Sequence, residues 1–171
     1  MIEQAELKRI YNNITSNKAY LSTLHRNDDA IKWVLIFGLD NSHREIGITQ
    51  NGYWGVKSSD HFRIFNKETS LLYFIILLEY PIEDIKRKLI LSLNDFIELQ
   101  KINRVFPFGE IVKFVFEYNS SNYWVALAFE WFDQFTASEK QVLKESIDKI
   151  KNNYSLSQKV RQKAKKELKQ L

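Results

Sequence analysis

His61 and its neighbour Asp60 form the best acid–base pair in this sequence, because a carboxylate can orient and charge an adjacent imidazole. The other two histidines, His25 and His43, precede it at intervals of eighteen residues and share no short-motif spacing with it. A hydrolytic triad would also need a serine or threonine in a nucleophile-elbow pattern, which the sequence lacks. The simpler interpretation of Asp60 and His61 is a solvated pair in a loop.

Other residue types that support catalysis are missing or scattered. The sequence has no cysteine, which excludes disulfides, thiolate chemistry and sulfur-ligated zinc. The five glycines, at positions 38, 47, 52, 55 and 109, are too dispersed to form a phosphate-binding loop. The acidic pairs at 28–29 and 83–84 are adjacent residues that point apart, and the second pair suits a helix start. We therefore predict a non-enzymatic protein that needs no cofactor and no metal.

A group of aromatic and polar residues follows the strongest turn signal in the chain. Asn51 and Gly52 both tolerate positive φ, so the pair favours a type I′ hairpin turn. Tyr53 and Trp54 come directly after this turn, and the tract 58–61 is too polar to bury. Exposed aromatic side chains beside charged groups are typical of protein-binding hot spots.

We predict from this pattern that four residues contact a protein partner: Tyr53, Trp54, Asp60 and His61. In the alternative, Trp54 folds inward against Ile46 or Ile48 and leaves an ordinary loop.

The first half of the chain must position these residues on a sheet. Residues 3–24 have apolar positions at helical spacing, although Asn and Ser at 12–17 weaken the second part. The apolar run 31–39 predicts a buried strand, and the segments 45–50 and 53–57 on either side of the Asn-Gly turn complete an antiparallel meander. A short strand at 62–65 extends it.

The second half predicts helices around a hairpin. The apolar run 71–78 favours a helix over a buried strand, and a further helix follows Pro81. Alternation in 110–118 and the largely apolar run 123–132 predict two strands joined by a four-residue loop. Thr136 and Glu139 fit the capping box of a following helix.

These elements predict an α+β fold in the order α-β-β-β-α-α-β-β-α-α. A mainly antiparallel sheet of about five strands would carry helices on one face. We expect one domain over residues 1–155, followed by a basic amphipathic helix over 156–171. Scarce glycine and proline, at five and two, argue against flexible linkers.

The positive charge belongs to the C-terminal segment. Residues 156–171 hold six basic residues and one acid, a net charge of +5, whereas the whole chain carries +4, so the first 155 residues carry −1. This distribution weakens a nucleic-acid interpretation, because phosphate binding requires clustered charge on the folded surface. We favour the interpretation that residues 156–171 form a helix that folds back on the protein through Leu156, Val160 and Leu168. The alternatives are a nucleic-acid arm and a membrane-surface helix.

Nothing in the sequence predicts export or membrane insertion. The first residues lack the basic and apolar regions of a signal peptide, and the longest apolar run has eight residues, far fewer than the roughly 20 that span a bilayer. We expect a soluble, cytoplasmic protein of bacterial type.

The stretches 48–54 (ITQNGYW) and 124–132 (WVALAFEWF) belong to an aromatic-rich α+β chain without catalytic motifs. In this overall style the chain resembles the immunity proteins that accompany bacterial polymorphic and contact-dependent toxins. The resemblance implies that the partner is a protein, such as a toxin domain, that is neutralised by direct binding and occlusion of its active site. The alternative is a small nucleic-acid-associated or regulatory protein that uses its basic C-terminal helix.

Overall fold

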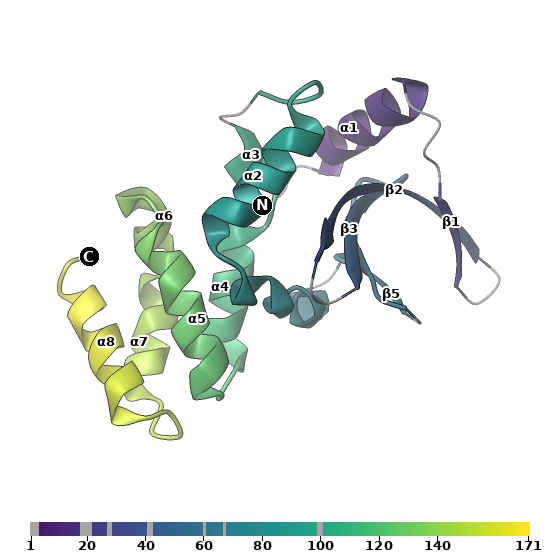
Figure 1. The fold of residues 1–171 in the computed structure, drawn as a ribbon. Helices are drawn as coiled ribbons and strands as arrows, with labels where there is room; N and C mark the ends of the chain where they lie inside the picture. The colour runs from purple at the N-terminus through teal and green to yellow at the C-terminus, as the bar shows by residue number, and fades with distance from the viewer. Residues whose placement is uncertain are drawn as a thin grey trace. The chain divides into compact units, whose positions relative to one another are not determined.

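The chain forms two compact units, one built around a sheet and one made of helices. A computed structural model describes residues 4–17, 22–26, 29–40, 43–59, 61–66, 68–98 and 101–171. Unit 1 comprises Met1–Tyr73 and Glu83–Pro107, and unit 2 comprises Phe74–Ile82 and Phe108–Leu171 (Figure 1). Residues 156–171, for which the sequence predicted a basic amphipathic helix, belong to unit 2.

Unit 1 contains an antiparallel sheet whose strands follow one another in chain order. The strands are β1 (Ser22–Arg26), β2 (Asp29–Leu39), β3 (Arg44–Thr49), β4 (Trp54–Lys57) and β5 (Phe62–Ile64). The predicted α+β class and the meander over β2, β3 and β4 are confirmed. The first helix, α1 (Gln4–Asn17), ends in the Asn- and Ser-rich part that the sequence marked as weak, short of residue 24, and the backbone of β1 pairs with β2.

Helices cover one face of this sheet. α1 packs on β2 and β3 through an apolar stripe at helical spacing, made up of Leu7, Ile10, Tyr11 and Ile14. α2 (Ile82–Leu93) is tied to β2 because the Ser92 hydroxyl donates to the Ile36 carbonyl at 2.7 Å. α3 (Ile102–Val105) precedes Phe106, whose ring contacts the buried Trp54 edge-on at 4.9 Å between centroids.

Two glycines allow aromatic rings to lie close to the other face of the sheet. Gly47 pairs with Gly55 across β3 and β4. The Trp33 ring lies over Gly47, and the Phe62 ring lies over Gly55. The two rings, one on β2 and the other on β5, meet edge-on at 5.1 Å between centroids, and Figure 1 shows that the sheet is curved. A side chain at either glycine would occupy the space of an aromatic ring.

Unit 2 is helical throughout its described secondary structure. Its elements are the 3₁₀ helix η2 (Ile75–Glu79) and α4 (Phe108–Tyr118), α5 (Asn122–Asp133), α6 (Ala137–Val142), α7 (Lys144–Asn152) and α8 (Gln158–Leu168). α4 packs on α5 and α7, and α8 packs on α7 and α5 (Figure 1). The Trp131 indole N–H on α5 donates to the Tyr80 carbonyl at 2.9 Å, which attaches the segment after η2.

The two strands predicted in this region, 110–118 and 123–132, are wrong. They are helices α4 and α5, so the predicted order of elements does not hold. In α4, Ile111 and Val115 are buried together with Val112 and Phe116, and this pairwise spacing of four residues belongs to a helix. The alternating apolar residues that suggested a strand are only part of the buried set, which as a whole has helical spacing.

The remaining predictions for this half agree better with the structure. The run 71–78 lies in two 3₁₀ helices, η1 (Glu68–Tyr73) of unit 1 and η2, and not in a strand. Thr136 and Glu139 form the predicted capping box. Leu156 and Val160 are buried and Leu168 is half-buried, and the C-terminal helix folds back on α7 and α5 as predicted. None of the described helices combines the length and apolar character needed to cross a lipid bilayer.

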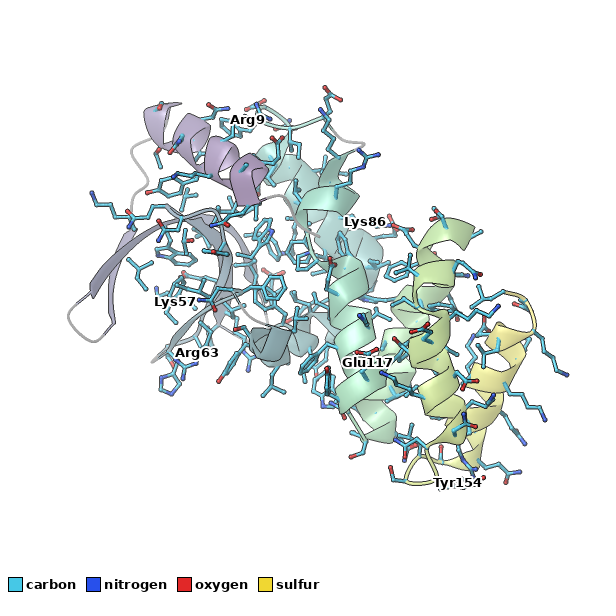
Figure 2. All side chains as sticks on the ribbon, turned by 180° about the vertical axis from the view of Figure 1, so that it is seen from behind. Arg9, Lys57, Arg63, Lys86, Glu117 and Tyr154 are labelled. Atoms are coloured by element: carbon cyan, nitrogen blue, oxygen red, sulfur yellow. The ribbon has the colours of Figure 1, made fainter. Side chains whose placement is uncertain are left out.

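Glu117 is a largely buried carboxylate inside unit 2, with its side chain 11% exposed. It accepts hydrogen bonds from the Ser146 hydroxyl at 3.0 Å and the Lys149 ammonium at 3.1 Å. Figure 2 labels Glu117 on α4. Burial alone would raise its pKa, but the hydrogen bonds from Lys149 and Ser146 and the charge of Lys113 outweigh it and hold the pKa below its usual value.

Glu117→Gln should lower the free energy of unfolding by about 1–2 kcal/mol at pH 7, because it weakens two hydrogen bonds to a charged acceptor. Since the folded pKa is depressed, the contribution of Glu117 is present above the unfolded pKa of about 4.3 and is lost as pH falls through the folded value. Urea denaturation of the wild-type protein and of Glu117→Gln at a series of pH values from 7 to 3 should therefore give free energies of unfolding that become more similar as the pH falls. The exposed Glu130→Gln is the control, and a difference that stays constant over this range would contradict the expectation.

Candidate functional site

Three of the four residues predicted to contact a partner are described by the structure, and their surroundings in unit 1 differ. Trp54 is fully buried, and its indole N–H donates to the Val105 carbonyl. Its expected position at the surface is therefore wrong, and the inward alternative is the one observed. The reason is register: Trp54 pairs with Ile48 on the helix-covered face of the sheet. His61 is exposed, whereas Asp60 lies outside the described residues, so the Asp60–His61 pairing stays a prediction.

Tyr53 lines a hollow between the hairpin turn and the start of α1. The hollow has a volume of about 460 Å³ and is bordered by Gln4, Ala5, Lys8, Asn51 and Tyr53. The Gln4 amide donates to the Asn51 carbonyl at 2.8 Å, which ties the turn to the helix. Among these five residues Lys8 carries the only charge, so the hollow offers hydrogen bonds and one cation to a ligand.

The turn beside the hollow is a hairpin, as predicted, but not of type I′. Gly52 has a φ of 74°, whereas Asn51 does not have positive φ. The amide of Thr49 donates to the Tyr53 carbonyl at 2.9 Å, so the loop has three residues and one left-handed glycine. A Cβ at position 52 would also collide with the backbone of Gln4. This glycine is thus what lets α1 approach the turn.

A second candidate site lies at one end of unit 2, where three tyrosines are exposed. Tyr118 ends α4 and is 63% exposed, Tyr123 lies in the first turn of α5 and is 54% exposed, and Tyr154 precedes α8 and is 85% exposed. The Asn122 side chain accepts a hydrogen bond from the Ser157 amide at 2.7 Å, which joins the start of α5 to the loop before α8. Figure 2 shows Tyr154 at this end of the unit. We call Tyr118, Tyr123, Tyr154 and the loops 119–121 and 153–157 the tyrosine end.

Both loops of the tyrosine end are folded by the same local device. The Asn119 side chain accepts from the Ser121 amide at 2.8 Å, and the Asn153 side chain accepts from the Ser155 amide at 3.0 Å. Such Asx turns replace backbone hydrogen bonds and fix the loop conformation. Tyr154 is the central residue of the second turn. Its position is therefore set before any partner binds.

Two of the tyrosines are further held by neighbours. The Tyr123 hydroxyl donates to the Glu79 carboxylate at 3.0 Å, and this hydrogen bond raises the pKa of Tyr123. The Arg161 guanidinium lies over the Tyr154 ring at 4.9 Å from its centroid, a cation–π contact. The tyrosine end therefore combines aromatic area, hydroxyl groups and an arginine.

The structure describes the side chains of two of the three histidines. His43 and His61 are both exposed. No group of three or more histidine, aspartate and glutamate side chains that could hold a metal ion occurs among the described residues.

The sequence interpretation missed the tyrosine end because its two halves looked like an ordinary hairpin loop and a linker. The available signal was composition: 118–123 reads YNSSNY and 152–157 reads NNYSLS. Tyrosine, serine and asparagine together are the residue types that antibody loops use for protein recognition.

Comparison with known proteins does not assign a family. The chain matches no protein-family model, and it has no significant match among curated proteins or among solved structures.

Proposed function

We propose that this chain is a non-enzymatic protein-binding module of the immunity type, which neutralises a toxin by direct contact, and that the tyrosine end makes this contact. The observation that carries the proposal is the exposure of three tyrosines, one in a loop and two at helix ends that flank another loop, where both loops are already fixed by hydrogen bonds. The toxin as partner comes from the resemblance to immunity proteins described above.

The energetics favour recognition of a protein at this end. Tyrosine supplies a large, rigid contact surface at low conformational cost, and serine and asparagine supply adaptable hydrogen bonds. Because Asx turns and the Asn122–Ser157 hydrogen bond hold the loops, little ordering entropy remains to be lost on binding. Tyrosine and arginine are also the side chains that most often dominate binding free energy.

Exchanging Tyr118, Tyr123 and Tyr154 for alanine should weaken binding to the cognate toxin domain by at least about 30-fold, which corresponds to 2 kcal/mol of hot-spot energy. The same variant should lose the ability to protect cells that express the cognate toxin domain. Since the side chains are more than half exposed, the thermal stability of the protein should change little. Calorimetric titration and a growth-protection assay measure the two effects.

Val142→Ala is the matched control, because Val142 is 76% exposed on the same unit but lies outside the tyrosine end. Tyr53→Ala tests the hollow in unit 1. A loss of affinity with Tyr53→Ala and none with the triple variant would move the contact surface to the hollow. Lack of any complex with, or protection against, toxin domains from the same locus would refute the immunity role.

A further inference from the structure

The solvent-facing side of α8 has an unusual composition. Within the helix and its C-terminal cap, every exposed residue is lysine or glutamine: Gln158, Lys159, Gln162, Lys165, Lys166 and Lys169. The opposite side is buried against the bundle through Val160, Ala164 and Glu167. In Figure 2 long side chains with nitrogen at their ends extend away from this helix.

The lysines on this side are separate from the charge pairs that hold α8 in place. Lys163 binds Asp133 at 2.9 Å and Glu167 at 3.0 Å, and Arg161 stacks on Tyr154. By contrast, no described acidic side chain lies within ion-pair distance of Lys159, 165, 166 or 169. We call these four residues the lysine face.

The lysine face is a compact strip. At about 100° and 1.5 Å per residue, its members fall within a sector of about 120° and span about 15 Å along the helix axis. The rest of unit 2, residues 74–82 and 108–155, holds five basic and eight acidic residues and so carries −3. The positive charge is therefore concentrated on one side of an otherwise acidic unit. This places clustered charge on the folded surface, which the sequence alone did not establish.

From this arrangement we infer that the lysine face binds the phosphate backbone of duplex nucleic acid, an activity separate from the proposed toxin neutralisation. Charge complementarity points to a polyanion, and 15 Å of B-form duplex carries about nine phosphate charges. Lysine acts as a point charge toward phosphate, and glutamine also contacts backbone oxygens.

The other classes of partner fit this face less well. Protein interfaces are depleted in lysine and enriched in aromatic residues, whereas the lysine face and its intervening residues contain no aromatic side chain. A membrane-surface helix needs a free apolar side to enter the lipid, but that side of α8 is buried. Single-stranded nucleic acid is bound with stacking aromatics, which are also missing from this face.

Four phosphate contacts predict a specific salt dependence. The slope of log K against log salt concentration should be about −3.6, which is about a 150-fold loss of affinity between 50 and 200 mM salt. Each lysine replaced by glutamine should reduce the slope by about 0.9. Binding should not depend on sequence, because none of the groups on this face is placed to distinguish bases.

The test is fluorescence anisotropy of a labelled 20-base-pair duplex of arbitrary sequence titrated with the full-length protein at 25–200 mM salt. The variant K159Q/K165Q/K166Q/K169Q should lose binding. The control K32Q/K101Q/K113Q/K144Q removes the same amount of charge from exposed lysines elsewhere, and it should retain most of the affinity for the duplex. Thermal unfolding of both variants checks that α8 stays packed.

Several outcomes would overturn the inference. One is an equal loss of duplex affinity in both variants, and another is wild-type duplex affinity in the variant that lacks the lysine face. A third is tighter binding to poly-glutamate than to the duplex, which would assign the face to an acidic protein. Tighter binding to phosphatidylserine vesicles would assign it to a membrane. The alanine variant of the tyrosine end should bind the duplex normally, so failure of this inference and failure of the toxin-binding proposal can be distinguished.

Discussion

Replacing Trp54 with alanine should lower the free energy of unfolding of unit 1 by about 3–5 kcal/mol. Trp54 is fully buried between Ile48, its partner in the sheet, and the Phe106 ring. Its removal leaves a cavity at the centre of the core and leaves the Val105 carbonyl without its donor. Urea denaturation followed by circular dichroism should show an earlier transition, with the slope unchanged if only stability is affected.

A pair of phenylalanine variants separates the hydrogen bond from the packing. Trp33 is as deeply buried as Trp54, but its indole nitrogen has no described hydrogen-bond partner. Trp54→Phe should therefore cost about 1–3 kcal/mol more than Trp33→Phe, because only the former leaves a buried carbonyl unsatisfied. Equal losses of stability would mean that the bond between Trp54 and Val105 contributes nothing net.

Gly47→Ala should lower the stability of unit 1 by about 1–3 kcal/mol or more, the range for overpacking a core. The new Cβ would overlap both the Val34 carbonyl and the Trp33 ring. Because this carbonyl belongs to the neighbouring strand, the overlap can be removed only if β2 and β3 separate locally. Amide hydrogen exchange should show loss of protection along this pair of strands, and thermal unfolding should shift to lower temperature.

Gly109→Ala is the matched control in the helical unit. A Cβ at position 109 would meet no heavy atom within 4 Å, and the residue lies in the first turn of α4. Alanine there should be neutral or stabilise the protein by up to about 1 kcal/mol, because it restricts the unfolded chain. If both glycine variants were equally damaging, steric overlap at Gly47 would not be the cause.

The meander of unit 1 and the capping box of α6 could be predicted from sequence because both depend on neighbouring residues. The Asn-Gly turn fixes the register between β3 and β4, and Thr136 lies three residues from Glu139. The type of turn could not be predicted, since docking of α1 against Gly52 decides the backbone there.

Helices α4 and α5 were mistaken for strands because buried helices in a small bundle are apolar on more than one side. Phe114 and Phe129 are buried as the strand interpretation also required, so burial alone did not distinguish the two structures. In α5, Val125, Ala128 and Phe129 follow the spacing of three and four residues that indicates a helix. Aromatic and β-branched residues favour strands only weakly, and tertiary packing overrides that preference.

Neither surface proposed to bind a partner could be located from sequence alone. The two loops of the tyrosine end are separated by the 31 residues 122–152 of the chain. The hydrogen bond between Asn122 and Ser157 brings them to the same end of unit 2. The position of the Trp54 side chain was likewise decided by the strand register and by a carbonyl 51 residues away.

The path of the chain between the two units has a consequence for synthesis on the ribosome. The polypeptide enters unit 2 at Phe74, returns to unit 1 at Glu83 and enters unit 2 again at Phe108. The carbonyl of Tyr80 therefore emerges 51 residues before the indole of Trp131 that binds it. At typical elongation rates this is a delay of about 3–10 s, during which the apolar segment 74–82 has no native partner from the later helices. Nascent chains halted near residue 107 should be the species most in need of a chaperone.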